Sequence, residues 1–440
     1  MPSETSFVLN GRRVELGRTD PTQTLLRWLQ RHGSHGTKEG CGDGDCGACT
    51  VALVEIDAHG RAHHRAVNSC LLPVGLLPGR EVTTVEALAD GANLHPVQQA
   101  MVDHAGSQCG YCTPGFVMSL FCASHEGALG DDAIAGNLCR CTGYAPIRAA
   151  AAQLATLTPA DRFADALAAP RVPIAGAALG DFFSPASLEA AIALKATHPY
   201  AAWIAGGTDV GVELSQHKVV APAFIALDRI AALRVLEFDG MPISTEPRTL
   251  SPAPLPVGEG KLSMLRIGAG VPLERLRRDA AGLFPSLDTM LEWFAGRQVR
   301  NRATLGGNLG TASPIGDLLP VLLALDASIE LRGPRGSRTI AAADFFLDYR
   351  KTARAADELV VAVELARVPG RVDAAFKVAK RQTDDISLVA AAFALERDAA
   401  GIVTHVRLAY GGVAATPVRA KTCEAFLLGR TLDATTVGEA

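Results

Sequence analysis

Cysteine is the residue type whose clustering in this sequence most clearly indicates chemistry. The chain has 440 residues and ten cysteines, and all of these but Cys423 lie between Cys41 and Cys141. The sequence does not open with a basic segment followed by an apolar one, so no secretory signal is visible and we expect a cytoplasmic protein. Because thiols stay reduced in the cytosol, clustered cysteines there indicate metal ligands rather than disulfides.

The first group of cysteines lies in GCGDGDCGACT, which holds Cys41, Cys46 and Cys49, and Cys70 follows further along. The spacing C-x4-C-x2-C with a distant fourth cysteine is typical of plant-type [2Fe-2S] sites. Structural zinc is the alternative, but it usually takes two separated pairs of ligands. Backbone N–H groups must turn toward the sulfurs to offset their negative charge, which favours glycine. The glycines available are Gly40, Gly42, Gly44 and Gly47.

The second group consists of two close pairs, in QCGYCTPG and GNLCRCTGY. They are Cys109 with Cys112 and Cys139 with Cys141. By spacing alone, zinc competes with an iron–sulfur cluster here, because paired cysteines are common zinc ligands. The remaining thiol of this region, Cys122, is flanked by apolar residues, and we expect it to be buried in the core.

Two glycine-rich segments could hold phosphate groups. WIAGGTDVG spans Trp203–Gly211, and RNRATLGGNLGTASPIGD spans Arg300–Asp317. Glycine N–H groups together with threonine hydroxyls can cradle a phosphate, although either segment alone is better explained by simple turns. The sequence has no strand–GxGxxG–helix unit, so it gives no support for a standard dinucleotide fold.

Composition sets limits on the kind of protein. With 48% hydrophobic and 20% charged residues, the chain has enough apolar material for about three domains and is not a disordered protein. The net charge of -4 gives no general attraction for nucleic acid. No apolar run approaches the roughly 18 residues of a membrane span. We therefore expect neither a nucleic-acid partner nor a membrane.

The elements that must position these motifs change in character along the chain. SFVLNGRRVEL predicts a hairpin with an Asn-Gly turn, and helical spacing follows in residues 94–158. A Pro-, Gly- and Ala-rich linker comes next, and then helices alternate with short apolar runs. Thr245–Gly260 is Pro-rich and is predicted to be an exposed loop. The predicted regions are 1–86, 87–160, the linker 161–182, 183–330 and 331–440.

Taken together, the cysteine motifs resemble those of the xanthine dehydrogenase (molybdenum hydroxylase) family. CGDGDCGACT, QCGYCTPGFVM and GNLCRCTGY are similar to segments of its iron–sulfur subunit. The resemblance implies a [2Fe-2S] cluster at each cysteine group, the second one nearer to a molybdenum cofactor. We expect Cys70 to be the fourth ligand of the first cluster. The resemblance also implies that Gln108 contacts the pterin of the molybdenum cofactor.

The glycine-rich segments resemble the FAD domain of the same family, as do KRQTDDISL, DYRKT and YGGVAATPVRAKT. The resemblance implies that Phe294 stacks near the adenine and that Asp317 holds the ribityl chain or the flavin. It places Ile386 against the isoalloxazine ring and Lys421 near the flavin edge. The residues implied to wrap the diphosphate and ribityl chain are Ile204, Ala205, Gly206, Gly207, Thr208, Asp209, Val210 and Gly211, and then Ala303, Thr304, Gly306, Gly307, Asn308, Gly310 and Thr311.

Other charged residues have more ordinary interpretations. Arg297, Arg300 and Arg302 form a local basic patch, for which we expect salt bridges or steering of the flavin phosphates rather than nucleic-acid contacts. His63 and His64 have no evident partner ligands, and we expect them in a solvated loop between strands.

The fold implied by the resemblance is a multidomain α+β chain. It has a β-grasp [2Fe-2S] ferredoxin domain, a four-helix [2Fe-2S] domain, a linker, a two-part α/β FAD-binding domain and a C-terminal α+β domain. Family members continue beyond the position of Ala440, so we expect the last domain to be truncated.

The function implied by the resemblance is electron transfer, and no catalytic residue is assigned to this chain. A molybdopterin-binding large subunit would oxidise hypoxanthine and xanthine to urate, in purine catabolism. Electrons would pass through the two clusters and FAD to NAD+. The implied assembly is an (αβ)2 heterotetramer. The alternatives are the same type of subunit serving an aldehyde or N-heterocycle hydroxylase, and a free-standing NADH-dependent electron carrier.

Overall fold

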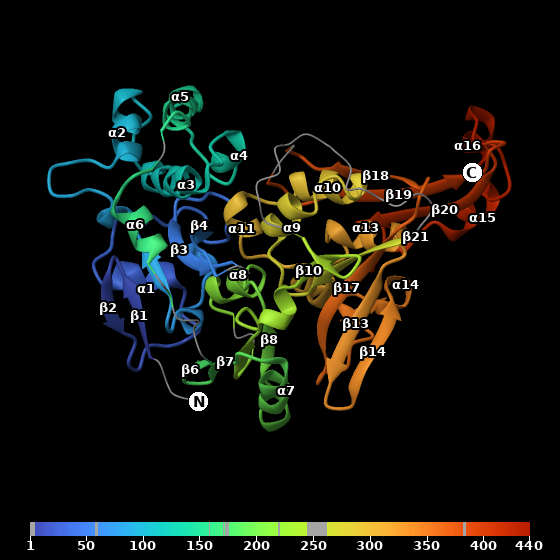
Figure 1. Cartoon of the computed structure of the whole chain (residues 1–440), viewed down its shortest axis with the longest axis horizontal. Helices are drawn as coiled ribbons and strands as arrows, with labels where there is room; N and C mark the ends of the chain where they lie inside the picture. Colours follow the sequence, from blue (N-terminus) through green and yellow to red (C-terminus); the bar gives the residue numbers. More distant parts are fainter. Residues whose placement is uncertain are drawn as a thin grey trace. The chain divides into compact units, whose positions relative to one another are not determined.

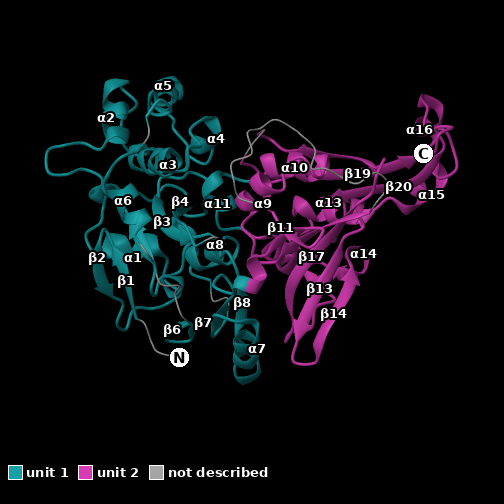
Figure 2. Cartoon of the chain, viewed as in Figure 1, with its two compact units in different colours: residues 1–231, 295–303 teal, residues 232–294, 304–440 magenta. Residues whose placement is uncertain are grey.

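The chain forms two compact units, each made from two separate stretches of sequence (Figure 2). The first unit comprises Met1–Ala231 and Ala295–Ala303, and the second comprises Ala232–Phe294 and Thr304–Ala440. The predicted loop Thr245–Gly260 lies outside the described residues. The computed structural model describes residues 5–57, 60–157, 159–169, 171, 176–218, 221–243, 262–381 and 384–440.

The first unit begins with a five-stranded sheet and one helix, as predicted for a β-grasp domain. The elements are β1 (Ser6–Leu9), β2 (Arg12–Glu15), α1 (Leu25–Arg31), β3 (Thr50–Ile56), β4 (Ala62–Asn68) and β5 (Glu81–Thr83), with the short 3-10 turns η1 (Ser69–Leu71), η2 (Val74–Leu76) and η3 (Val85–Ala87). The strand order is β2-β1-β5-β3-β4, with β1 and β5 parallel. Asn10 and Gly11 have φ of 54° and 75°, so they form the predicted hairpin turn.

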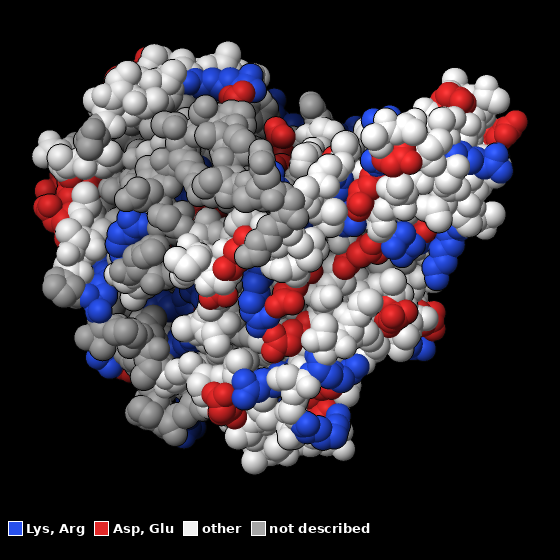
Figure 3. Space-filling view, turned by 45° about the vertical axis from the view of Figure 1, so that its right-hand side comes forward, with Lys and Arg blue, Asp and Glu red and all other residues white. Residues whose placement is uncertain are grey.

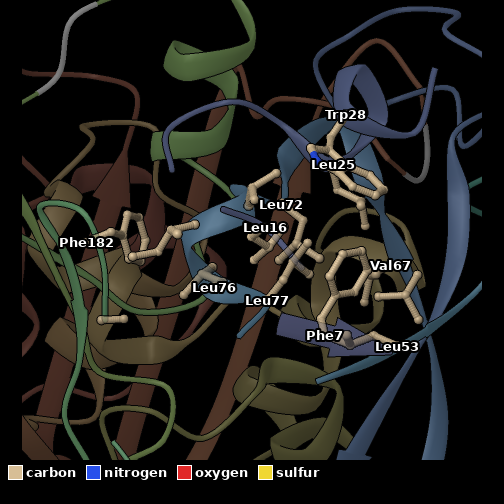
Figure 4. Close-up of a cluster of buried hydrophobic side chains, with 14 of the residues drawn as sticks. Phe7, Leu16, Leu25, Trp28, Leu53, Val67, Leu72, Leu76, Leu77 and Phe182 are labelled. Carbon is tan, nitrogen blue, oxygen red and sulfur yellow. The ribbon is translucent and has the colours of Figure 1, made fainter. Parts of the chain in front are cut away.

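The core of this domain lies between the sheet and α1. Phe7 from β1 and Trp28 from α1 pack edge to face, with ring centroids 5.3 Å apart, and Leu53 and Val67 complete this part of the core (Figure 4). Phe182 belongs to the same buried cluster, so the domain shares its core with the sheet that follows later in the sequence.

Four helices follow, as predicted for the second domain: α2 (Pro96–Asp103), α3 (Thr113–Glu126), α4 (Asp131–Ile134) and α5 (Ala145–Leu154) (Figure 1). Helix α3 is buried from Gly115 to Ser124, so it is the central helix of the group. It ends at Gly127, whose φ of 64° is the left-handed conformation that favours glycine at this position. The helical character of residues 94–158 is thereby confirmed.

The prediction that His63 and His64 lie in a solvated loop is wrong. Strands β3 and β4 pair from Thr50 and Asn68 as far as Ile56 and Ala62, so the turn comes before His63. The side chain of His64 is 2% exposed. Its ring centroid lies 5.0 Å from that of Phe121 and 5.4 Å from that of His125.

The segment expected to be a linker contains regular structure. Helix α6 (Arg162–Ala168) follows Asp161, which caps it, and strand β6 (Ala177–Leu179) joins a four-stranded sheet of order β6-β7-β9-β8. The polar cap is what starts a helix in this otherwise Ala- and Pro-rich stretch. The other elements of this part are β7 (Phe182–Ser184), α7 (Leu188–Thr197), β8 (Ala202–Ile204), α8 (Val210–Ser215), β9 (Phe224–Ala226) and, after residue 294, α11 (Arg297–Arg300).

The second unit contains a six-stranded antiparallel sheet of order β11-β10-β12-β17-β13-β14. The predicted boundary at residue 330 falls within β13, so strands from both sides of it belong to one sheet. The strands and the associated elements are η4 (Ala231–Arg234), β10 (Leu236–Phe238), β11 (Met241–Pro242), β12 (Ser263–Gly268), α9 (Leu273–Asp279), α10 (Pro285–Glu292), α12 (Leu305–Thr311), α13 (Leu318–Ala324), β13 (Ser328–Gly333), β14 (Gly336–Ala341), α14 (Ala342–Phe345), β15 (Phe346–Asp348), β16 (Lys351–Thr352) and β17 (Leu359–Arg367).

The last part of the chain forms a four-stranded sheet of order β18-β19-β20-β21, which is followed by two short helices. Helices α10 and α13 pack on its strands (Figure 1). Its elements are β18 (Val372–Val378), β19 (Val389–Arg397), β20 (Val403–Gly411), β21 (Val418–Arg419), α15 (Lys421–Leu427) and α16 (Ala434–Glu439). Among the helices within the described ranges, none is long and apolar enough to cross a membrane.

Candidate functional site

The first cysteine group forms two close pairs of thiols. Cys41 and Cys46 lie in the loop before β3, and the backbone N–H of each donates to the sulfur of the other at 3.3 Å. Cys49, just before β3, and Cys70, in η1, are both buried and hydrogen-bond through their thiols. A Cβ at Gly40 would lie 2.6 Å from Cys46 Sγ, so glycine is required there.

The closeness of these thiols perturbs their acidity. The hydrogen bond from Cys41 lowers the pKa of Cys46 to about 6, and the same bond, together with burial, raises the pKa of Cys41. In the other pair, the hydrogen bond with Cys49 raises the pKa of Cys70. In each pair, one thiol is therefore more easily deprotonated than the other, and deprotonated thiols are the form that binds metal.

The second cysteine group is also arranged as two pairs, but across the motifs rather than within them. Cys141 Sγ lies 3.5 Å from Cys109 Sγ, and the thiol of Cys139 hydrogen-bonds to that of Cys112, directly before α3. The backbone N–H groups of Cys141 and Thr142 donate to Cys139 Sγ at 3.4 and 3.5 Å. Burial raises the pKa of Cys112 to about 12.

Each group offers four thiols, the number that a [2Fe-2S] cluster requires. In a [2Fe-2S] cluster four thiolates are shared between two metals, whereas tetrahedral zinc needs its donors around one point. Within the described part of the chain, no group of three or more His, Cys, Asp or Glu is arranged to hold a metal ion, so the choice of metal rests on the spacing of the cysteines in the sequence. Cys122, by contrast, is buried among the helices, as predicted for a core thiol.

The two cysteine groups are connected through the backbone. The N–H of Leu138 donates to the carbonyl of Cys46 at 3.0 Å, and the Asn137 amide donates to the carbonyl of Gly47 at 3.0 Å. Asn137 also accepts a hydrogen bond from Gln298 of α11 at 2.9 Å. Sequence reasoning missed Asn137 and Gln298, because nothing in their local motifs indicates contacts so far along the chain.

The segment Ile204–Gly211 connects β8 to α8 in the first unit. A Cβ at Gly206 would lie 1.8 Å from the carbonyl oxygen of Arg302, and one at Gly211 would lie 2.2 Å from that of Leu71 in η1. Gly207 has φ of +80°. The glycines thus let this segment lie directly on the backbone of Arg302 and on the turn that carries Cys70. Ala205, Thr208, Asp209 and Val210 belong to the same connection.

The second glycine-rich segment forms α12 in the second unit, apart from Ala303, which ends the first unit. Thr304 caps the helix by accepting from the N–H of Gly307 at 3.0 Å. A Cβ at Gly306 would lie 2.7 Å from the carbonyl oxygen of Ala269, whereas one at Gly310 would meet nothing within 4 Å. Gly306 is therefore needed for packing, and Gly310 leaves the helix surface open.

Asn308 of α12 is a candidate contact for a ligand. Its side-chain Oδ1 is buried and has no hydrogen-bond partner among the described residues. A buried acceptor left unpaired is costly, and such groups commonly mark a missing ion or ligand. Asn308, Gly307 and Gly310 on α12 thus fit a polar group that approaches the backbone closely, as a diphosphate and ribityl chain would. Thr311 ends the helix.

Asp317 is held by two residues that sequence reasoning missed. Lys377 donates to its Oδ2 at 2.7 Å, and Ser387 donates to its Oδ1 at 2.5 Å. Lys377 also donates to the carbonyl of Trp293 at 3.0 Å. Asp317 is thus a fixed, ion-paired carboxylate that joins α13 to β18.

The other predicted contact residues are more accessible. Gln108 and Lys421 are exposed, Ile386 is 68% exposed, and Phe294 is half-buried. Gln108 directly precedes Cys109. Two residues after Cys109, the hydroxyl of Tyr111 donates to the carbonyl of Glu39. The accessible position of Gln108 and Cys109 is compatible with contact to a partner molecule.

The arginine patch is engaged in salt bridges, as one of the two predictions for it stated. Arg297 pairs with Glu126, Arg300 pairs with Asp132 at 2.5 Å, and Arg302 is also paired. On the face shown in Figure 3, positive and negative side chains are mixed over the described surface. Among the described residues on that face, no extended basic area is visible.

Four family models match successive parts of the chain. A 2Fe-2S iron-sulfur cluster binding domain matches residues 7–75, and a [2Fe-2S] binding domain matches residues 84–152. The FAD binding domain in molybdopterin dehydrogenase matches residues 177–244 and 257–367, and the CO dehydrogenase flavoprotein C-terminal domain matches residues 374–440. The zinc alternative for the second cysteine group is not supported by these matches.

Curated proteins are similar to nearly the whole of this chain. The chain is 32% identical to a xanthine dehydrogenase of Emericella nidulans, over 96% of this chain and 35% of that protein. It is also 32% identical to a xanthine dehydrogenase/oxidase of Gallus gallus, over 96% of this chain and 36% of that protein. The chain thus spans about a third of the length of these relatives.

A solved structure gives a similar result for part of the chain. It is a carbon monoxide dehydrogenase from Hydrogenophaga pseudoflava, 25% identical, with a TM-score of 0.50 over 61% of this chain and 85% of that chain. From its four domains and these relatives, the chain belongs to the molybdenum hydroxylase family and has the domains of its small iron–sulfur and FAD subunit.

Proposed function

We propose that the chain is the electron-transfer subunit of a xanthine dehydrogenase. The observation that carries this proposal is that eight cysteines form two sets of paired thiols on a chain that also has the FAD domain. The relatives at 32% identity are named xanthine dehydrogenases, which supports xanthine and hypoxanthine as the substrates of the complex.

When bound, two [2Fe-2S] clusters and FAD would carry electrons from a partner's molybdopterin centre to NAD+. The chain's own part is to hold and space these groups. The paired thiols would ligate the irons, and the N–H groups of Cys41, Cys46, Cys141 and Thr142 would offset charge on the sulfurs. The packing of Gly211 on Leu71 ties the proposed flavin segment to the turn of Cys70.

The partner proposed for this chain is a molybdopterin-binding large subunit, in a cytoplasmic (αβ)2 heterotetramer. The region that this chain matches is about a third of the length of its curated relatives. Exposed Gln108, beside Cys109, is the residue we propose for contact with the pterin. Lys421 and Ile386 are proposed to lie near the flavin ring.

A second candidate is the same type of subunit in a hydroxylase for another substrate, such as an aldehyde or an N-heterocycle. It is favoured by the similarity to the carbon monoxide dehydrogenase structure. Within this family substrate choice would lie with the partner subunit, so the experiment must use the whole complex.

The experiment is an anaerobic visible spectrum of the complex purified with its natural partner, before and after addition of xanthine. Bleaching of both the flavin and the iron–sulfur bands would support the proposal. Bleaching by NADH alone would retain the cofactors and reject xanthine. A preparation that is colourless even after reconstitution with iron, sulfide and FAD would contradict the cofactor assignment itself.

A further inference from the structure

Arg302 contacts the Ile204–Gly211 segment at Gly206 in two ways, through its backbone and through its side chain. Its backbone carbonyl occupies the place that a side chain at position 206 would take, 1.8 Å from the ideal Cβ. Its side chain Nε donates to the carbonyl of Gly206 at 3.2 Å. Gly206 and Arg302 are 96 positions apart in the sequence. Arg302 nevertheless holds the segment through both its backbone and its side chain.

The other two nitrogens of the guanidinium hold it in place. Nη1 donates to Glu55 of β3 at 3.0 Å, and Nη2 donates to Asp228, just after β9, at 3.0 Å. Arg302 is 7% exposed. All three nitrogens therefore have acceptors within the first unit, and the planar fork leaves its side chain little freedom to rotate.

The charge of Arg302 is not offered to a phosphate. Arg80 donates to the same Asp228 at 2.6 Å, so two guanidinium groups face the two carboxylates of Asp228 and Glu55. Although burial opposes it, the positive charges of Arg80 and Arg302 lower the pKa of Asp228 to about 2, which keeps the carboxylate ionised. With its charge matched in this way, Arg302 can act on a nearby ligand only through the geometry it imposes.

We propose that Arg302 is a positioning residue for flavin, which fixes the Ile204–Gly211 segment against the ferredoxin sheet and so sets the affinity for the diphosphate of FAD. This inference rests on the proposed function, since that segment is a flavin site only within it. Of the two roles expected for the arginine patch, Arg302 has the salt bridges. It would act on the flavin segment through its position and not by attracting the phosphates with its charge.

The test compares Arg302→Lys with Arg80→Lys in the full complex. Both variants keep the charge and lose the planar fork in the same ion-pair cluster. Arg80 is the matched control because its Nε donates to the carbonyl of Leu76 instead of Gly206. We expect Arg302→Lys to weaken FAD binding about tenfold or more, as for loss of a charged hydrogen bond, and Arg80→Lys to weaken it about twofold at most.

Each preparation is measured for FAD dissociation constant, for the midpoint potential of the bound flavin and for the signals of both clusters. Retained clusters, weak FAD binding and a shifted flavin potential in Arg302→Lys alone would support the inference. Wild-type FAD binding in Arg302→Lys, an equal loss in both variants, or loss of the clusters along with flavin would each overturn it. Gly206→Ala tests the backbone half of the contact, and it should lower FAD affinity while the clusters remain.

Failure of the proposed function gives a different result from failure of this inference. If the wild-type complex binds no FAD, the flavin assignment itself falls, and the role of Arg302 falls with it. If the wild-type complex binds FAD and is bleached by NADH, but the two lysine variants behave alike, only the role of Arg302 is overturned.

Discussion

Cys109 and Cys122 are thiols of one helical domain in opposite surroundings. Cys109 is exposed and faces Cys141 at 3.5 Å, whereas Cys122 is 2% exposed in the core. We expect Cys109→Ser to remove the signal of one cluster, because a serine oxygen is a poorer ligand for iron than a thiolate. FAD content and the other cluster should persist, as measured by electron paramagnetic resonance and flavin absorbance.

Cys122→Ala is the matched control for that variant. It should keep both cluster signals and cost about 1 kcal/mol of stability through lost packing. Disappearance of both clusters and of flavin in Cys109→Ser would contradict the separation of the sites.

Replacing Gly306 or Gly310 by alanine tests how closely each side of α12 is packed. A Cβ at Gly306 would meet the backbone of Ala269, and one at Gly310 would meet nothing within 4 Å. We expect Gly306→Ala to cost about 1–3 kcal/mol through overpacking, and Gly310→Ala to be neutral or to stabilise the helix by up to about 1 kcal/mol. Hydrogen exchange of α12 measures both, and equal protection in the two variants would refute this packing role.

At the scale of elements, β4 and α6 meet at a histidine cluster that should make the first unit sensitive to acid. Burial lowers the pKa of His64 to about 3, with His125, Arg171 and His63 acting in the same direction and Asp161 opposing them. Because its folded pKa lies below its unfolded pKa of about 6.5, the stabilisation is present above that pH and is lost as pH falls. Taken by itself, the His64 contribution to folding should be about 2 kcal/mol weaker at about pH 5 than at about pH 8.

Of the neighbouring groups, His125 acts against His64 above about pH 6.5, and Asp161 titrates only at lower pH. Although burial opposes it, hydrogen bonds to Asp161 and Phe121 raise the pKa of His125, so its contribution is complete below about pH 6.5 and is lost as the pH rises above that value. The pKa of Asp161 is lowered despite burial, by hydrogen bonds from His125 and His95, and its loss comes only at lower pH. In His64→Leu, the stability of β3 and β4, measured by hydrogen exchange, should depend less on pH than in the wild type. An unchanged pH dependence would assign the effect to another titrating group.

Elements were predictable from the sequence where a local pattern carries the information. The Asn10–Gly11 turn, the helices of residues 94–158 and the buried Cys122 depend on neighbours in the sequence or on side-chain type. The position of His64 was not predictable, because the length of the β3–β4 hairpin depends on pairing across strands rather than on local polarity. Helix α6 was hidden by its composition, since its single cap, Asp161, is fixed by two distant histidines.

The site was predictable as a list of residues but not as an arrangement. Spacing indicated eight cysteines, yet the partner of Cys109 is Cys141 rather than Cys112. Likewise, sequence motifs indicated Asp317 but not Lys377 and Ser387, which lie 60 and 70 residues away from it. Contacts at such separations are set by the path of the whole chain.

At the scale of the whole molecule, the two units should respond separately to removal of iron. All eight paired cysteines lie in the first unit, so their metal would stabilise that unit when bound. Chelation should raise hydrogen exchange in residues 38–49 and 108–144. The sheet containing β12 and β17 should keep its protection, and equal loss in both sheets would contradict independent units.

Because the first unit is formed by two stretches of sequence, it cannot finish folding until the second stretch has been synthesised. Gln298 and Arg302, which complete its buried polar contacts, follow Ala231 only after about sixty residues of the other unit. At about 5–20 residues per second, the ribosome needs roughly 3 to 12 s for that stretch. The nascent ferredoxin and helical domains must therefore wait for their last segment. During that interval, the groups that Gln298 and Arg302 later contact stay without these partners.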